Sequence, residues 1–218
     1  MAKLRVHSLA VSLDGYAAGP GQDAEHPMGH GGEQLHPWVF ATAYGQNMIG
    51  GEGGSRGVDD EWLRRGDVGI GATIMGRNMF GPIRGGWDTP EGLAWSGWWG
   101  PTPPYGHPVF VLTHHPRDPL SMDGGTVFNF VTGEIEDALE QAVAAAGGLD
   151  VRLGGGASAV QQYLRAGLVD ELHVATVPVL LGAGERFFDK LDGGPRGMEL
   201  AEFAASEKVA HSRFIRTR

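Results

Sequence analysis

Strand-like and helix-like segments alternate between residues 126 and 182, and this alternation constrains the fold more than any other feature of the sequence. Apolar residues recur at helical spacing over 135–146, after the predicted N-cap Thr132 and before the helix-stopping pair Gly147-Gly148. The other segments are predicted as strands over 126–131, 151–153 and 172–177 and as a helix over 157–166. Such alternation favours right-handed crossovers and a mainly parallel sheet.

The rest of the chain adds further strands and two short helices. Leu4–Ser12 is apolar and ends at the turn pair Asp14-Gly15. Strands are also predicted over 72–75 and 109–113, a closing antiparallel pair over 198–204 and 208–216, and helices over 33–44 and 59–65, the latter capped by an aspartate and closed by Gly66. Together these elements predict a three-layer α/β fold, with a mixed, mostly parallel central sheet flanked by helices and antiparallel C-terminal strands. At this length we expect one domain, residues 1–218.

Glycine is concentrated in the first half of the chain. Of the 37 glycines, 23 lie within residues 15–106, and all six tryptophans lie in the same half. Disordered linkers lack aromatic residues, so segments that mix glycine with tryptophan are expected to be ordered loops. We expect these loops to shape a substrate pocket or a dimer contact.

Charge and composition exclude several classes of function. The formal net charge is −9, so the chain is not expected to bind nucleic acid or an anionic membrane. Cysteine is absent, which removes disulfides and thiolate catalysis. No signal-peptide core or apolar run of membrane-spanning length occurs. These observations predict a cytoplasmic protein.

Two other patterns in the glycine-rich half have ordinary explanations. His26, His30 and His36 could ligate a metal with Glu25 or Glu33, but their irregular spacing favours exposed loop histidines, and we expect no metal. The segment 53–57 matches G-x-S-x-G, but no strand precedes it, so a nucleophile elbow is rejected.

Three predicted strands end in residues suited to bind phosphate. The turn Gly154-Gly155-Gly156 leads through Ala157 to Ser158 at a helix start, where a backbone can approach a pyrophosphate; a tight turn is the alternative. The segment 76–78 places Arg77 and Asn78 after a strand, where Arg77 could hold a phosphate or simply lie at the surface. The segment 113–115 offers a hydroxyl and two imidazoles, or only turn residues before Pro116. Parallel strands bring such ends to one edge of the sheet.

Taken in order, these segments resemble the dihydrofolate reductase superfamily, and more closely the C-terminal reductase domain of riboflavin biosynthesis. The similarity rests on residues 9–15, 75–78 and 111–113 and on a long run over 154–188 that includes Gly167-Leu168-Val169-Asp170-Glu171-Leu172 and Pro178-Val179-Leu180-Leu181-Gly182-Ala183-Gly184. The resemblance covers most of the chain. It implies an NADPH-dependent reductase, usually a homodimer, that acts on a small molecule.

The resemblance also implies roles for particular residues. The residues expected to bind NADPH are Ala10, Gly76, Arg77, Asn78, Thr113, His114, Gly154, Gly155, Gly156, Ala157 and Ser158. Asp14 would face the substrate beside the nicotinamide. Folate-reducing relatives place a carboxylate on the first helix, for which Glu33 is the candidate here, so Asp14 and Glu33 are the predicted catalytic residues.

The leading hypothesis is therefore an NADPH-dependent reductase of a small heterocyclic or carbonyl substrate. One alternative keeps the fold and assigns the reduction of 5-amino-6-(5-phosphoribosylamino)uracil in riboflavin biosynthesis. Another is a nucleotide-binding module that has lost catalysis. Residues 19–57 and 81–106 are longer than the resemblance leads one to expect, so the substrate is left open.

Overall fold

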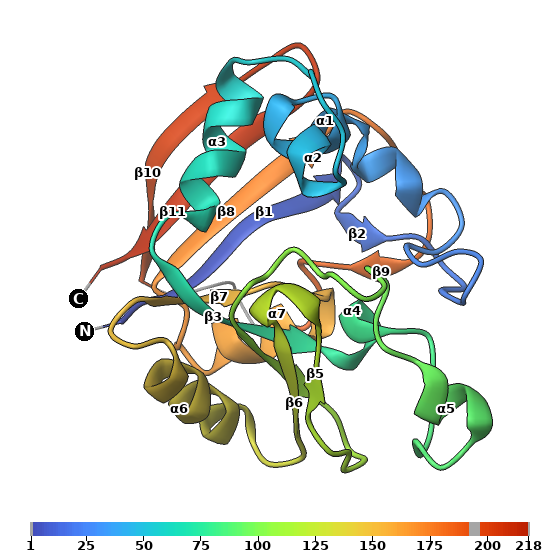
Figure 1. Cartoon of the computed structure of the whole chain (residues 1–218). Helices are drawn as coiled ribbons and strands as arrows, with labels where there is room; N and C mark the ends of the chain where they lie inside the picture. Colours follow the sequence, from blue (N-terminus) through green and yellow to red (C-terminus); the bar gives the residue numbers. More distant parts are fainter. Residues whose placement is uncertain (1, 192–196, 218) are drawn as a thin grey trace.

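The computed structural model describes residues 2–191 and 197–217 and is built around a nine-stranded sheet (Figure 1). Its strand order is β10-β11-β8-β1-β7-β3-β4-β6-β5. The strands are β1 (Leu4–Ser12), β3 (Ile70–Gly76), β4 (Pro108–Leu112), β5 (Leu120–Ser121), β6 (Val127–Val131), β7 (Asp150–Leu153), β8 (Glu171–Val177), β10 (Met198–Ala205) and β11 (Ala210–Arg216). The six strands from β8 to β6 in this order are mutually parallel, and β5, β10 and β11 are antiparallel to their neighbours. The predicted mixed, mostly parallel sheet with antiparallel C-terminal strands is confirmed.

Helices cover both faces of the sheet. The main helices are α1 (Pro37–Phe40), α2 (Ala43–Met48), α3 (Val58–Asp67), α6 (Ile135–Ala145) and α7 (Ala157–Arg165). In Figure 1, α3 and α1 lie over the part of the sheet that contains β11, β8 and β1. On the other face, α6 and α7 pack against the parallel strands and against each other, with the Tyr163 hydroxyl donating to the Ile135 carbonyl at 2.7 Å.

Adjacent residues of one strand divide between the two faces. Val11 belongs to the core beneath α6 and α7, whereas Ala10 packs with Trp38 and Leu63 on the opposite face. In β4, Phe110 joins the first core, while Val109 and Val111 join a separate aromatic cluster opposite it. This alternation is the period of two expected of strands that are buried on both faces.

The structure divides the helix that was predicted over residues 33–44. The helix predicted over 33–44 is three pieces: the 3-10 turn η1 (Gly32–Leu35), α1 and α2. Pro37 begins α1, because its missing N–H is tolerated only in the first turn of a helix. The Thr42 side chain accepts from Gly45 N at 3.0 Å, so Thr42 caps a new helix instead of continuing the old one.

The ends of α3 and α6 also differ from the prediction. No aspartate caps α3: its N-cap is Gly57, and Asp59 instead accepts hydrogen bonds from β11 and from Ser206. Gly66 lies inside the helix, where a Cβ would overlap the His7 ring. Glu134 caps α6 in place of Thr132, in a reciprocal capping box with Asp137.

Several short elements have too few residues to give a periodic signal in the sequence. These are β2 (Tyr16–Ala18), which pairs with β9 (Glu185–Arg186), and α4 (Arg77–Phe80), α5 (Pro90–Ala94) and η2 (Asp123–Gly125). Within the described part of the chain, no helix has both the length and the apolar character needed to cross a membrane.

Candidate cofactor site at the carboxyl edge of the sheet

Two of the predicted phosphate-binding segments are directly hydrogen-bonded to each other. Gly76 N, at the end of β3, donates to Gly155 O at 2.7 Å, and Gly154 N, just after β7, donates to Ile74 O at 2.8 Å. Because β3 and β7 are parallel neighbours, their carboxyl ends meet at one edge of the sheet. The structure therefore brings residues 76–78 and 154–158 together.

The turn over 154–156 forms an open approach to the start of α7. Gly155 has a φ of +115°, which a residue with a side chain rarely adopts, and the Gly155–Gly156 peptide bond is cis. A Cβ on Gly156 would meet no atom within 4 Å, so the space in front of this residue is empty. Gly156 is also the N-cap of α7 and has no side chain to accept from the first-turn N–H groups. These N–H groups are suited to bind an anionic ligand.

Arg77, the first residue of α4, is held by several contacts. Its Nε donates to Ile83 O at 3.1 Å, and its Nη1 donates to Thr113 Oγ1 at 3.2 Å, which brings the third predicted segment to the same edge. The guanidinium lies over the Trp87 ring, 3.8 Å from its centroid. Its Nη2 is buried and has no hydrogen-bond partner among the described residues. A buried donor without a partner is costly, so this nitrogen is a candidate for binding a ligand.

Two further arginines lie near Arg77. Arg117 lies 4.9 Å from the Trp87 centroid, and its Nη1 is likewise buried without a partner. Burial first, and then the charges of Arg84 and Arg117, lower the pKa of Arg77, while burial lowers the pKa of Arg117. No carboxylate in the described ranges forms an ion pair with any of the three. The result is a local excess of positive charge in a chain that is acidic overall.

The remaining residues predicted to bind cofactor occupy this edge in different environments. Thr113 is buried, and its N donates to Val131 O at 3.0 Å. His114, Asn78 and Ser158 are exposed. Ala157 is buried at the start of α7, and Ala10 is buried near the end of β1, opposite Ala175 of β8. Their contacts with a cofactor stay predictions.

Asp14, a predicted catalytic residue, holds the loop that follows β8. Its carboxylate accepts from Ser12 Oγ at 2.6 Å, from Leu181 N at 3.1 Å and from Gly182 N at 2.7 Å. The hydrogen bond from Ser12, together with those from Gly182 and Leu181, lowers the pKa of Asp14 to about 2. At neutral pH this carboxylate is ionised and has no proton to donate.

Glu33, the other predicted catalytic residue, is exposed on η1. Its backbone carbonyl accepts from His36 N at 3.2 Å. Nearby, the His26 and His30 rings are 4.0 Å apart, and His26 Nδ1 pairs with Asp23. In the described part of the chain, no three His, Asp or Glu side chains are placed to hold a metal ion.

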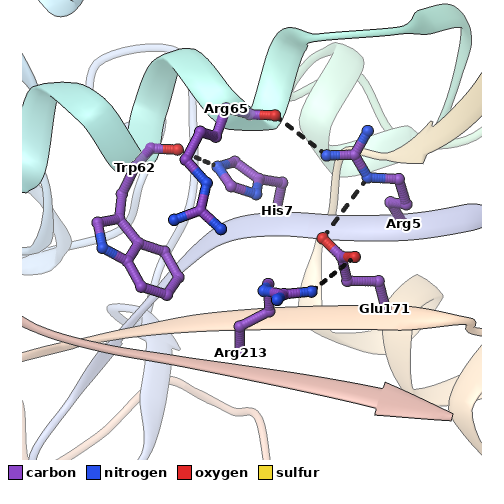
Figure 2. Close-up of a pocket in the computed structure, with 6 residues that line it drawn as sticks. All are labelled: Arg5, His7, Trp62, Arg65, Glu171 and Arg213. Atoms are coloured by element: carbon purple, nitrogen blue, oxygen red, sulfur yellow. Dashed lines mark hydrogen bonds and ion pairs between the residues drawn. The ribbon is translucent and has the colours of Figure 1, made fainter. Parts of the chain in front are cut away.

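A small charged pocket lies between α3 and the sheet, near the amino ends of β1 and β8 (Figure 2). Its volume is about 190 Å³, and its lining residues are Arg5, His7, Trp62, Arg65, Glu171 and Arg213. Glu171 pairs with Arg5 at 3.6 Å and with Arg213 at 3.2 Å, and Arg65 pairs with Glu202 at 2.7 Å. These arginines are neutralised by carboxylates, unlike Arg77, Arg84 and Arg117. The ion pairs around this pocket therefore connect α3 to the sheet, and they leave no free positive charge for a ligand.

Comparison with known families agrees with the geometry of the carboxyl edge. The family profile of the RibD C-terminal domain matches residues 6–210, which is nearly the whole chain. The chain belongs to the RibD C-terminal domain family. This membership confirms the resemblance drawn from the sequence motifs. None of the curated proteins that were compared matches the chain.

Solved structures share the fold of this RibD C-terminal domain at low sequence identity. A protein from Shewanella sp. PV-4 assigned to riboflavin biosynthesis is 20% identical, with a TM-score of 0.60 and full coverage of both chains. RibD from Acinetobacter baumannii is 17% identical, with a TM-score of 0.57; all of this chain aligns with 59% of the length of that protein. Dihydrofolate reductase from Enterococcus faecalis, solved with NADP(H), is 16% identical with a TM-score of 0.51; 99% of this chain covers 97% of that one. These similarities confirm the dihydrofolate-reductase-like fold.

Sequence reasoning missed three members of this site: Arg84, Trp87 and Arg117. Each lies outside the recognised segments, and Trp87 belongs to a loop whose path the sequence does not predict. Arg117 follows the 113–115 segment closely, and its position just after a strand end was the available signal.

Proposed function

We propose that this RibD C-terminal domain is an NADPH-dependent reductase that transfers hydride to a small heterocyclic or carbonyl substrate. The observation that carries the proposal is a pair of buried guanidinium nitrogens, on Arg77 and Arg117, that have no hydrogen-bond partner in the described part of the chain and lie at the edge that also holds the Gly154–Gly156 turn. A cofactor with several phosphates would supply the missing acceptors. Family membership and the likeness to a dihydrofolate reductase solved with NADP(H) support the same choice of cofactor.

In this proposal the residues of the chain bind and orient the reactants. Bound NADPH supplies the hydride. The Gly154–Gly156 turn and the N-terminus of α7 would hold the pyrophosphate, and the three arginines would hold the phosphates of the adenosine half. Asp14 would act as a positioning residue, since its carboxylate holds residues 181 and 182 at the end of β8.

A second candidate is the specific reduction of 5-amino-6-(5-phosphoribosylamino)uracil. Family membership favours it, because a bifunctional deaminase/reductase of that name from Thermotoga maritima shares the fold, with 10% identity and a TM-score of 0.54. A nucleotide-binding module without catalysis is the remaining alternative. NADPH oxidation, followed against dihydrofolate, pyrimidine and quinone substrates, separates the three: turnover of one class identifies the reductase. Saturable NADPH binding with no turnover on any of them would favour the module.

We also propose that the protein forms a homodimer in the cytoplasm. Support for the dimer comes from β10, an edge strand of the sheet that exposes Leu200 and Phe203 by 58% and 62%. An apolar edge strand left uncovered would promote uncontrolled association. Light scattering of the purified protein tests the dimer, and a monomeric mass at all concentrations would refute it.

A further inference from the structure

The two long glycine-rich segments, residues 19–57 and 81–106, meet at an open cleft. The cleft has a volume of about 760 Å³, within the range of small-molecule sites. One wall is the end of α2 and the turn after it, and the other is the loop that precedes β4. Its lining includes Asn47 and Ile49 on the first wall and Trp98, Trp99, Thr102 and Tyr105 on the second.

The cleft is adjacent to the candidate cofactor site through α4. Trp98 Nε1 donates to Asn78 O at 3.5 Å, and Asn78 belongs to the predicted cofactor segment. Met79, the next residue, lies next to Gly155, since a Cβ on Gly155 would be 3.5 Å from the Met79 sulfur. The short helix α4 therefore contacts both the glycine turn and Trp98 on one wall of the cleft.

The lining has no ionisable group that would be charged at neutral pH. Trp98, Trp99 and Tyr105 supply flat aromatic surfaces, and Asn47, Thr102 and the backbone supply neutral hydrogen-bonding groups. Burial raises the pKa of Tyr105 to about 12, so its phenol stays protonated. A planar, uncharged molecule suits such a surface.

None of the residues that line the cleft is a lysine or an arginine, although Arg56 and Arg84 belong to the segments 19–57 and 81–106. Residues 6–55 and 85–116 have no lysine or arginine. The same stretches contain seven carboxylates, namely Asp14, Asp23, Glu25, Glu33, Glu52, Asp88 and Glu91. A phosphate group entering the cleft would lose water and gain no cation from the lining, which is unfavourable. The arginines without carboxylate partners that we identified lie at the cofactor edge instead.

We propose that this cleft binds the substrate of the reductase, and that the substrate is an uncharged planar heterocycle or quinone that has no phosphate. The inference rests on the proposed function and narrows it, because it disfavours a phosphoribosyl substrate. It also gives a role to the enlarged segments 19–57 and 81–106, which would form a neutral aromatic binding site.

Riboflavin and its 5′-phosphate, FMN, provide a matched pair of probes, since they share one planar ring system and differ by the phosphate. We expect the NADP⁺-loaded protein to bind riboflavin at least about ten-fold more tightly than FMN in calorimetric titrations. Trp98→Ala should weaken riboflavin binding by about ten-fold, because it removes a stacking surface. Equal or tighter binding of FMN, or failure of both probes to bind, would overturn the proposal.

A charge-introducing variant tests the same idea without removing packing. Ile49 is 53% exposed at the cleft, and Leu149 is 49% exposed outside it. Ile49→Arg should raise FMN affinity relative to riboflavin by about ten-fold, whereas Leu149→Arg, with the same change in net charge, should leave the ratio unaltered. An unchanged ratio in Ile49→Arg would count against the cleft. If the wild-type protein bound no NADPH but still discriminated between riboflavin and FMN in the absence of nucleotide, the proposed function alone would be refuted.

Discussion

The guanidinium of Arg77 lies 3.8 Å from the centroid of the Trp87 ring, and its buried Nη2 has no hydrogen-bond partner among the described residues. Stacking on an aromatic face fixes the plane of the guanidinium without using its donors. Because Nε and Nη1 donate to Ile83 O and Thr113 Oγ1, Nη2 is the nitrogen available to a phosphate. The guanidinium of Arg117 lies near the rings of Phe80, Trp87 and Phe130, so the same aromatic cluster positions both cations.

Arg77→Ala should weaken NADPH binding by about 1.5–3 kcal/mol, which is the range for a hydrogen bond to a charged group. The measurement is the dissociation constant from calorimetry or from quenching of tryptophan fluorescence. Arg165, an exposed arginine at the end of α7, offers a matched control, and Arg165→Ala should leave the constant unchanged. An unaltered dissociation constant in Arg77→Ala would contradict the assignment.

Arg117→Ala should reduce both the affinity for NADPH and its dependence on salt. The wild-type site concentrates three arginines without carboxylate partners, so its attraction for phosphates is screened as ionic strength rises. Titrations at low and high salt measure this dependence for the wild type and the variant. A salt dependence that is the same in both proteins would remove Arg117 from the phosphate site.

Asp14→Asn should slow turnover more than it weakens NADPH binding. The variant loses an acceptor for Leu181 N or Gly182 N, which loosens the loop after β8 without touching the arginines. Steady-state kinetics and a parallel NADPH titration separate the two effects. Equal losses in both would assign Asp14 to the scaffold.

Three histidines beneath α3, the buried His173 and His211 and the partly buried His7, should make the protein less stable in mild acid. His173 Nε2 and His211 Nδ1 are 3.0 Å apart, and His211 Nε2 lies 3.0 Å from Asp59. Burial lowers the pKa of His7 to about 3 and, with the neighbouring histidines and arginines, that of His173 to about 2; burial also lowers the pKa of His211, partly offset by Asp59.

Because these pKa values are lowered in the folded state, the unfolded chain binds more protons below its ordinary histidine pKa of about 6.5. The stabilisation is complete above that pH and is lost as the pH falls toward the folded values. We expect the free energy of unfolding to fall by on the order of 1 kcal/mol per pH unit for each buried histidine. Urea unfolding at a series of pH values measures the slope. His173→Gln should flatten it, and the exposed His114→Gln should not; identical slopes in all three proteins would refute the account.

Gly66→Ala should destabilise the fold by about 1–3 kcal/mol, the usual cost of overpacking. In a helix interior, alanine is intrinsically preferred to glycine, so propensity alone predicts the opposite sign. The overlap with His7 decides the outcome, because the ring lies where the new methyl group would be placed. Thermal unfolding distinguishes the two, and a rise in the melting temperature would show that α3 can move away from β1.

Much of the sheet could be predicted because its central strands are buried on both faces and read as continuous apolar runs. The helices α6 and α7 showed clear periodicity because each buries one face against the sheet. The single helix predicted over residues 33–44 was wrong because Thr42 caps a new helix, α2, instead of continuing the preceding one. The three strand-end motifs were found from the glycines, the arginine and the hydroxyl and imidazole side chains that follow predicted strands. The contact between Arg117 and Trp87 could not be predicted, because it depends on the path of a long loop that has no periodic signal.

The central claim is that the carboxyl edge of this RibD C-terminal domain binds NADPH through Arg77, Arg117 and the glycine turn. A titration of the wild-type protein with NADPH, followed by tryptophan fluorescence, tests it most directly. The account predicts saturable binding with a dissociation constant in the micromolar range or below, weakened in Arg77→Ala. Absence of saturable binding to the wild-type protein would contradict it.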